Sequence, residues 1–210
     1  MASKAKTSGG TDPRQPGGAV EETEGVLHSP REEDIRNRAY EIHLQRGTQP
    51  GYEADDWLQA ERELALKGTK AIALRLVALF NDRRLDLLES VLHPEFRGRG
   101  ISAFAPDKPE VGPGARRKLY EMLLQAIPDA RGEVLNVVAE GDKVVLVDRF
   151  GGTHRGEFLG RPGTGNRVEW MAIHVYTIRG GKILEDAYMR DELAIMKQLG
   201  LAASPKKAAE

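Results

Sequence analysis

Two stretches of this chain decide its fold: GEVLNVVAEGDKVVLVDRFGGTH at residues 132–154 and VEWMAIHVYTIRGGKILEDAYM at residues 168–189. Both are long runs rich in apolar and β-branched residues, which favour strands, and each run is divided by a short turn. Gly141-Asp142 and Gly180-Gly181 are typical hairpin turns. The pattern therefore predicts two hairpins, with strands over 132–140, 143–154, 168–178 and 182–189.

The segments upstream of these strands have helical spacing instead. Their apolar residues predict helices over 69–81, 85–92 and 115–127. Gly68 is expected to begin this unit, a Gly- and Pro-rich loop is expected over 97–113, and a last helix stops at Gly200. Helices followed by an antiparallel meander indicate the α+β class. We expect a curved sheet that wraps over the helices and leaves a cone-shaped cavity.

A small helical hairpin is expected before this domain. Ser29-Pro30-Arg31-Glu32 combines a capping serine, a proline at the first helical position and a glutamate three residues on. A Gly- and Pro-containing turn over 47–51 then separates two short helices. Both chain ends lack large apolar residues, which is typical of disorder. The predicted organisation is a disordered tail (1–28), a helical hairpin module (29–67), the main domain (68–201) and a second disordered tail (202–210).

Composition restricts the chemistry available to this chain. It contains no cysteine, which excludes disulfides, thiol nucleophiles and thiolate metal sites. Its net charge of -1 gives no reason to expect nucleic acid or an anionic membrane as a partner. No histidine and carboxylate spacing suggests a metal site, and no apolar run suits a signal peptide or a membrane span. We therefore expect a cytoplasmic protein without a metal or a cofactor.

Four stretches in the second half carry a family resemblance. They are Ile127-Pro128-Asp129, residues 138–144, residues 152–165, and Gly181-Lys182-Ile183-x-Glu185 with Asp191-Glu192-Leu193 and Gln198-Leu199-Gly200. In this order they resemble the SnoaL-like polyketide cyclases (ester cyclases) of the nuclear-transport-factor-2-like superfamily, over residues 67–201. Upstream, residues 31–67 with Asp56-Trp57-Leu58-x-Ala60-Glu61 resemble the domain-of-unknown-function family 2934, which implies no known activity.

The resemblance implies a reaction type. In the characterised polyketide cyclases of this family, one aspartate near the end of the last strand is the general acid and base. It acts on a carbon acid next to a carbonyl and closes a ring without metal or organic cofactor. The matching residue here is Asp191. The chain has Asp186-Ala187 where His-Trp is common, which is expected to change the pocket wall, and Asp148-Arg149 where an aromatic residue is usual.

The candidate catalytic residues are Asp191, His154 and Asp148, and each has a structural alternative. Asp191 follows an apolar strand, where burial would raise its pKa, but aspartate is also a preferred helix cap. His154 could relay a proton or fix the Gly-rich loop. Asp148 could pair with Asp191, an arrangement that resembles the Asp, Arg and Asp group of limonene-type epoxide hydrolases, or it could face solvent and pair with a neighbouring strand. Arg116-Arg117-Lys118 is most simply a solvated helix start.

The expected cavity takes a hydrophobic or carbonyl-containing small molecule. Its predicted lining is Trp170, His174, Phe150, Met189, Phe80 and Tyr120. One hypothesis is a cofactor-free cyclase or isomerase that uses Asp191. The alternative is a non-catalytic module in which the cone only holds a ligand or supports dimerisation. The resemblance also implies a homodimer through the exposed sheet face, and fold alone does not choose between these functions.

Overall fold

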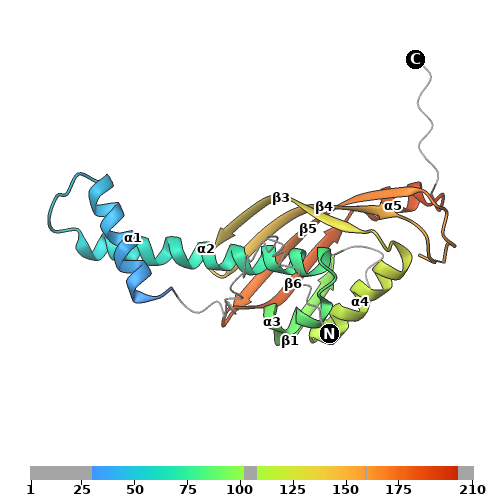
Figure 1. Ribbon diagram of the computed structural model, residues 1–210, viewed down its shortest axis with the longest axis horizontal. Helices are drawn as coiled ribbons and strands as arrows, with labels where there is room; N and C mark the ends of the chain where they lie inside the picture. Colours follow the sequence, from blue (N-terminus) through green and yellow to red (C-terminus); the bar gives the residue numbers. More distant parts are fainter. Residues whose placement is uncertain (1–29, 102–107, 159, 203–210) are drawn as a thin grey trace, which may run out of the picture.

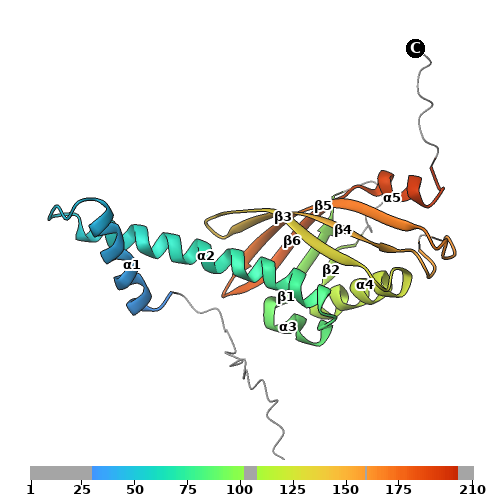
Figure 2. The same ribbon diagram turned by 45° about the horizontal axis from the view of Figure 1, so that its top comes forward.

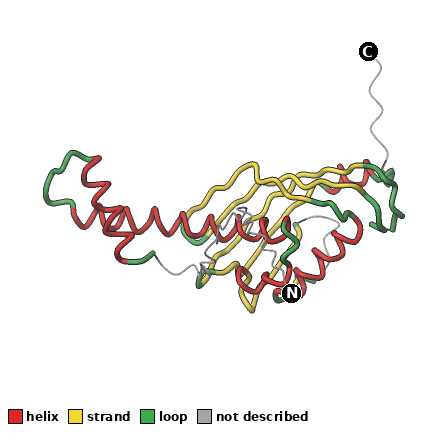
Figure 3. The backbone as a smooth tube through the Cα atoms, viewed as in Figure 1, coloured by secondary structure: helices red, strands yellow, loops and turns green. Residues whose placement is uncertain are grey.

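The computed structural model describes residues 30–101, 108–158 and 160–202, which form one six-stranded sheet with helices on one face (Figures 1 and 3). The predicted tail 1–28, and 203–210 of the second tail, lie outside the described residues. The elements in chain order are α1 (Glu32–Gln45), α2 (Glu53–Asn81), the 3₁₀ helix η1 (Leu85–Leu87), α3 (Leu88–Val91), β1 (Leu92–Gly100), β2 (Glu110–Val111), α4 (Pro113–Ala126), β3 (Arg131–Glu140), β4 (Lys143–Thr153), β5 (Arg167–Arg179), β6 (Lys182–Arg190) and α5 (Glu192–Gln198).

The four predicted strands form the antiparallel part of the sheet. The strand order is β2-β1-β6-β5-β4-β3, and β3 to β6 pair antiparallel in sequence order. Gly141, Gly180 and Gly181 have φ values of 57°, 55° and 72°, a left-handed conformation that glycine adopts without a steric penalty. The predicted α+β class and both hairpins are confirmed.

Strand β1 corrects the prediction for residues 85–113. The expected helix ends at Val91, and residues 92–100 form a strand instead of helix end and loop. β1 lies parallel to β6, with an irregular register between Leu92 and Arg97. Its burial does not alternate regularly and it contains Pro94, so no period-2 signal marked it as a strand. Pairing with β6, far away in the sequence, makes this segment extended.

The helices cover the inner face of the sheet and bury two apolar clusters. In the first cluster, Leu76 of α2 packs with Leu146 of β4 and Tyr176 of β5. The second lies toward the other end of the sheet, where Phe80 packs with Trp170 and other residues of this cluster. The inner face of the sheet therefore packs against the second part of α2. The second cluster also contains Phe150 and Trp170, which line a cavity.

Helix α2 is continuous through Gly68, so the predicted break there is wrong. Its first part packs against α1, where Ile35, Ala39, Ile42 and Ala60 are buried together, and its second part packs on the sheet. Figures 1 and 2 show α1 and the start of α2 projecting beyond the sheet. One helical glycine costs roughly 1 kcal/mol, which packing at both ends of α2 outweighs. The division into units at 67/68 stays a prediction.

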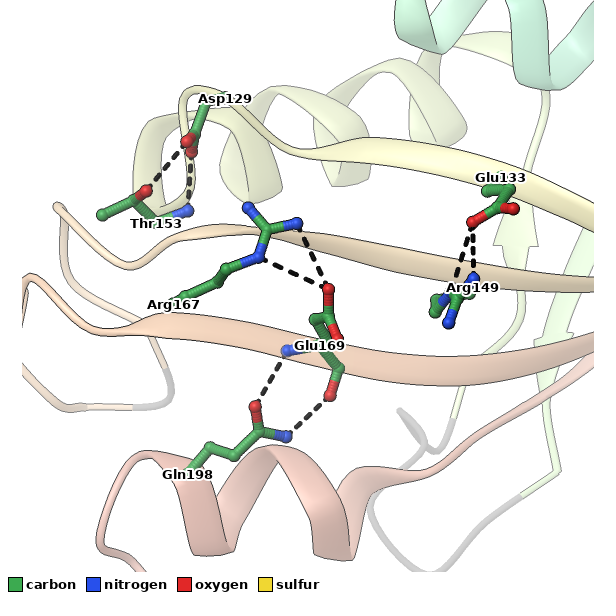
Figure 4. A network of polar contacts seen from close by, with 7 residues as sticks. All are labelled: Asp129, Glu133, Arg149, Thr153, Arg167, Glu169 and Gln198. Carbon is green, nitrogen blue, oxygen red and sulfur yellow. Dashed lines mark hydrogen bonds and ion pairs between the residues drawn. The ribbon is translucent and has the colours of Figure 1, made fainter.

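Helices α1 and α5 lie at the two ends of the described chain. Helix α1 begins at Glu32, after Pro30, and the predicted cap Ser29 lies outside the described residues. At the other end of the chain, the Gln198 side chain accepts from the Glu169 backbone N–H at 2.8 Å and donates to its carbonyl at 2.6 Å (Figure 4). This clamp holds α5 on β5. Among the described helices, none has the length and apolar character needed to cross a membrane.

Candidate active site

A cavity of about 80 Å³ lies on the inner face of the sheet, bordered by β4, β5, β6, α4 and the segment after β4. Its lining is Arg116, Leu119, Tyr120, Met122, Leu123, Phe150, Phe158, Trp170, Ala172, His174, Tyr188 and Arg190. Most of these side chains are apolar or aromatic, three are basic and none is acidic. An apolar pocket with a few polar groups is the usual form of a small-molecule site.

Strand alternation explains why these residues meet. On β5, Trp170, Ala172 and His174 are buried while the residues between them face outward. His174 pairs with Tyr188 of β6, and Ala172 pairs with Arg190. The small side chain of Ala172 leaves space between larger neighbours. The cavity therefore lies beside Ala172.

A buried network of charges lies at one wall of the cavity. Asp186 is 1% exposed, and it accepts hydrogen bonds from His174 Nδ1 at 3.0 Å and ion-pairs with Arg116 Nη1 at 2.9 Å. The Arg116 side chain, also 1% exposed, donates from Nε to Glu110 at 2.8 Å. The hydroxyl of Tyr188 donates to the same carboxylate at 3.3 Å. Such a network is stable only when each charge has a partner, and here Asp186 joins two cations.

The network sets the charges of His174 and Asp186. Burial opposes ionisation of Asp186, but His174 and Arg116 outweigh it and lower the pKa of Asp186. Burial likewise opposes the charged imidazole, but the carboxylates of Asp186 and Asp148 outweigh it and raise the pKa of His174. Asp186 is therefore an ionised partner that fixes the ring and makes His174 a stronger base.

Asp148 approaches the other nitrogen of the same ring. It is fully buried on β4, and its Oδ2 lies 3.9 Å from His174 Nε2. Neither carboxyl oxygen has a hydrogen-bond partner among the described residues. Burial raises the pKa of Asp148 to about 6. His174 thus lies between one carboxylate held ionised and one carboxyl that titrates close to neutral pH, a separation typical of acid–base sites.

The structure places several predicted pocket residues on the cavity. Trp170, His174, Phe150 and Tyr120 line it. Phe80 does not line it but packs edge-on against Tyr120 and Phe150, at centroid distances of 4.9 and 5.5 Å. Phe80 therefore supports the aromatic wall from behind.

The predictions for Asp191 and Met189 need correction. Asp191 is exposed, and its Oδ1 accepts from the Ala194 backbone N–H at 2.9 Å, so it caps α5 and does not line the cavity. Met189 is 51% exposed on the outer face, where it pairs with Ile173. Both follow from the alternation of β6: residues 186, 188 and 190 face inward, 189 faces outward, and Asp191 comes after the strand has ended.

The remaining candidates lie apart from the cavity lining. His154 is buried at the start of the Gly-rich loop, and its Nδ1 is 3.1 Å from Thr164 Oγ1 and 3.3 Å from the Thr164 backbone nitrogen. The predicted Asp148–Asp191 pair does not form. Asp148 faces Ala172 of β5, and Ala172 faces Arg190 of β6, so a strand lies between the two carboxyl groups.

Sequence reasoning missed Arg116, Asp186, Tyr188 and Glu110 as parts of the site. Arg116 was predicted to be solvated, but it is among the largest fully buried side chains. A signal was present, because Arg116 and Tyr120 are four residues apart and share one face of α4. Across residues 30–101, 108–158 and 160–202, no group of three or more His, Cys, Asp or Glu residues has the arrangement of a metal site.

Comparisons with known protein families identify two parts of the chain. The family model described as SnoaL-like polyketide cyclase matches residues 70–199. A second model, described as a protein of unknown function (DUF2934), matches residues 30–65, which contain α1 and the first part of α2. No curated protein gives a significant match to this chain.

Several solved structures are similar to the chain. AclR from Streptomyces galilaeus, a hydroxylase candidate, is 29% identical with a TM-score of 0.60, over 68% of this chain and 91% of AclR. A SnoaL-like polyketide cyclase candidate from Jannaschia Sp. CCS1 is 26% identical with a TM-score of 0.58, over 65% and 94% of the two chains. IdmH from Streptomyces antibioticus, a polyketide cyclase candidate, is 25% identical with a TM-score of 0.56, over 63% and 98%.

Proposed function

This chain belongs to the SnoaL-like polyketide cyclase family. We propose that its cavity binds a small carbonyl compound, and that a residue of the cavity removes a proton from the carbon next to the carbonyl group. The reaction type would be that of a cyclase or isomerase. The observation that carries the proposal is His174, which lines the cavity and is hydrogen-bonded to the buried carboxylate of Asp186 at 3.0 Å. This assigns proton transfer to His174 and not to Asp191.

The two carboxyl groups have different parts in the proposed step. Asp186 accepts a hydrogen bond from the Nδ1–H of His174, which leaves Nε2 as the nitrogen that exchanges protons. Asp148, with a pKa of about 6, lies 3.9 Å from Nε2 and helps to raise the pKa of His174, so the ring and not Asp148 holds the proton near neutral pH. The deprotonated form of His174 takes a proton from the carbon next to the carbonyl, and Asp186 stabilises the imidazolium that forms. The enolate carbon then attacks a second carbonyl carbon of the same molecule, the π bond of that carbonyl breaks, and the imidazolium gives the proton to the resulting alkoxide oxygen.

The experiment follows deuterium entering a simple carbonyl probe. Acetophenone in D₂O exchanges its methyl protons through the enolate, and mass spectrometry measures the rate without knowledge of the natural substrate. We expect the wild-type protein to accelerate exchange and His174→Gln to lose about 10²- to 10⁴-fold of the protein-dependent rate, the usual contribution of a general base.

His43→Gln is the matched control. His43 lies on α1, with Nδ1 3.8 Å from a carboxylate oxygen of the buried Asp56, away from the residues of the cavity. This variant should exchange the probe at the wild-type rate. Wild-type protein that binds acetophenone without accelerating exchange would favour the non-catalytic ligand-binding function, and full activity in His174→Gln would remove His174 from the reaction.

The outer face of the sheet supports a second proposal, that of a homodimer. Met171, Ile173 and Val175 of β5 are 39%, 45% and 37% exposed, and Met189 of β6 is 51% exposed beside Ile173. Val147 of β4 pairs with Ile173 on its other side. Apolar side chains thus lie next to one another across three strands, as in surfaces that bind another protein. We infer that a second copy of the chain covers this face.

A further inference from the structure

We propose that the ligand of the cavity carries a carboxylate, and that Arg190 binds it. The inference rests on the proposed function in one respect, that the cavity is the ligand site. It adds the chemical class of the ligand, a small flat acid, and a residue that selects it. Proton transfer by His174 is a separate claim that the experiment below does not use.

Arg190 has an unused donor at the cavity. It is the last residue of β6, pairs with Ala172 and lines the cavity. Its Nε is buried and has no hydrogen-bond partner among the described residues. Its ion pair with Glu192, from Nη2 to Oε1, is 3.4 Å long. A buried donor without an acceptor is costly, and a ligand oxyanion would supply the acceptor.

The other basic groups of the lining already have anionic partners. Arg116 binds Glu110 and Asp186, and His174 binds Asp186. Those carboxylates are not themselves part of the lining, so the cavity presents basic groups without acidic ones. A carboxylate in the cavity would therefore meet basic groups of the lining, and at Arg190 it would compete with the carboxylate of Glu192. Arg190, with a buried N–H still unpaired, is the group in the lining suited to bind it.

The rest of the lining fits a flat ring. The rings of Phe150 and Trp170 are stacked, with centroids 5.8 Å apart and an interplanar angle of 10°. Trp170 and Arg190 are both neighbours of Ala172. Trp170 is two residues before it on β5, and Arg190 pairs with it from β6. A volume of about 80 Å³ is small for an aromatic ring. The proposal therefore requires the flexible side chain of Met122, which is 64% exposed, to move aside.

The test compares two probes of similar shape, 4-fluorobenzoate and 4-fluorobenzamide, by fluorine NMR titration of the full chain at neutral pH. We expect wild-type protein to bind the benzoate about tenfold more tightly than the neutral amide, the effect of one charge-assisted contact. Arg190→Gln should bring the two affinities within about threefold of each other. Its benzamide affinity should stay at the wild-type value, which also verifies an intact cavity.

Arg167→Gln is the matched control. Arg167 forms an ion pair with Glu169, two residues on, at 3.2 Å, the same spacing as Arg190 and Glu192 but on exposed side chains (Figure 4). This variant should keep the benzoate preference. Glu192→Gln removes the competing carboxylate and should tighten benzoate binding several-fold, so it tests the proposal even if Arg190→Gln does not fold.

Four outcomes would overturn the proposal: equal affinity of wild-type protein for both probes, no binding of either, a benzoate preference that survives Arg190→Gln, or weaker benzoate binding in Glu192→Gln. Deuterium exchange separates this result from the proposed function. If wild-type protein exchanges acetophenone protons but shows no benzoate preference, His174 keeps its role and only the acidic ligand is wrong.

Discussion

At the scale of single residues, Asp186 and Ala187 show how one strand divides its side chains between two environments. Both differ from the His-Trp that is common in the family, and the loss of the tryptophan was expected to change the pocket wall. The structure corrects that expectation, because Ala187 pairs with Val175 on the outer face. Asp186 faces inward and supplies the anion that His174 and Arg116 share. The change that affects the site is therefore the one at residue 186.

Asp148 leads to a prediction about pH and stability. Burial raises its pKa from 3.8 to about 6, so between these values the folded chain holds a proton that the unfolded chain has released. Its contribution to stability is therefore present below pH 4 and is lost as the pH rises to 6. The loss is about 3 kcal/mol, at 1.36 kcal/mol per pKa unit.

Asp148→Asn should remove this pH dependence. Asparagine stays neutral, so the variant should become more stable relative to wild-type protein as the pH rises from 4 to 6, by up to about 3 kcal/mol. Urea denaturation of both proteins at several pH values measures the difference, in which the other titrating groups largely cancel. A difference that does not change with pH would show that Asp148 titrates normally.

At the scale of elements, α2 shows that packing outweighs a local break signal. A glycine in the middle of a helical pattern and a change in family resemblance at the same point both favoured two helices. The observed helix runs from Glu53 to Asn81, because α1 stabilises its first half and the sheet its second half. Strand β1 shows the reverse case, where pairing with β6 produced a strand that local sequence did not indicate.

Two glycine substitutions test this interpretation at the element scale. A Cβ added at Gly68 would meet nothing within 4 Å, so Gly68→Ala should stabilise the protein by about 0.5–1 kcal/mol.

A Cβ at Gly132 of β3 would lie 2.9 Å from the ring of Phe150, so Gly132→Ala should destabilise the protein by about 1–3 kcal/mol. Thermal unfolding of the two variants and of wild-type protein measures both changes in stability. A destabilised Gly68→Ala would indicate that α2 needs flexibility at this point.

At the scale of the whole molecule, the sheet separates two surfaces with different uses. Its inner face is covered by α2, α3 and α4 (Figures 1 and 2). This face carries the cavity, while the outer face exposes apolar side chains of β5 and β6. The arm formed by α1 and the start of α2 projects beyond the sheet. A homodimer through the outer face would leave the cavity lining free in each copy.

The homodimer gives the prediction at this scale. Ile173→Glu places a charge in the middle of the proposed interface and should weaken dimerisation by about 100-fold or more, as expected at a buried interface position. Leu58→Glu is the control, since Leu58 is 47% exposed on the arm. Analytical ultracentrifugation over a concentration series compares the three proteins. Wild-type protein that stays monomeric at all concentrations would contradict the proposal.

The sequence by itself determined the class of fold, the two hairpins and which residues of β5 share one face. These features depend on periodicity and turn glycines, which are local: Trp170 and His174 face inward because they share the parity of a strand with one buried face. The order of four motifs was also sufficient to indicate the family that the matching model shows.

Only the tertiary structure decided which charged groups form the candidate site. Arg116, Asp148, His174 and Asp186 come from four elements, and their proximity depends on how α4 crosses strands that are distant in the sequence. Asp191 fits an active-site aspartate by position but is exposed at a helix cap, because β6 ends one residue before it. Burial and pairing set the pKa of a carboxyl group, and both are properties of the folded chain.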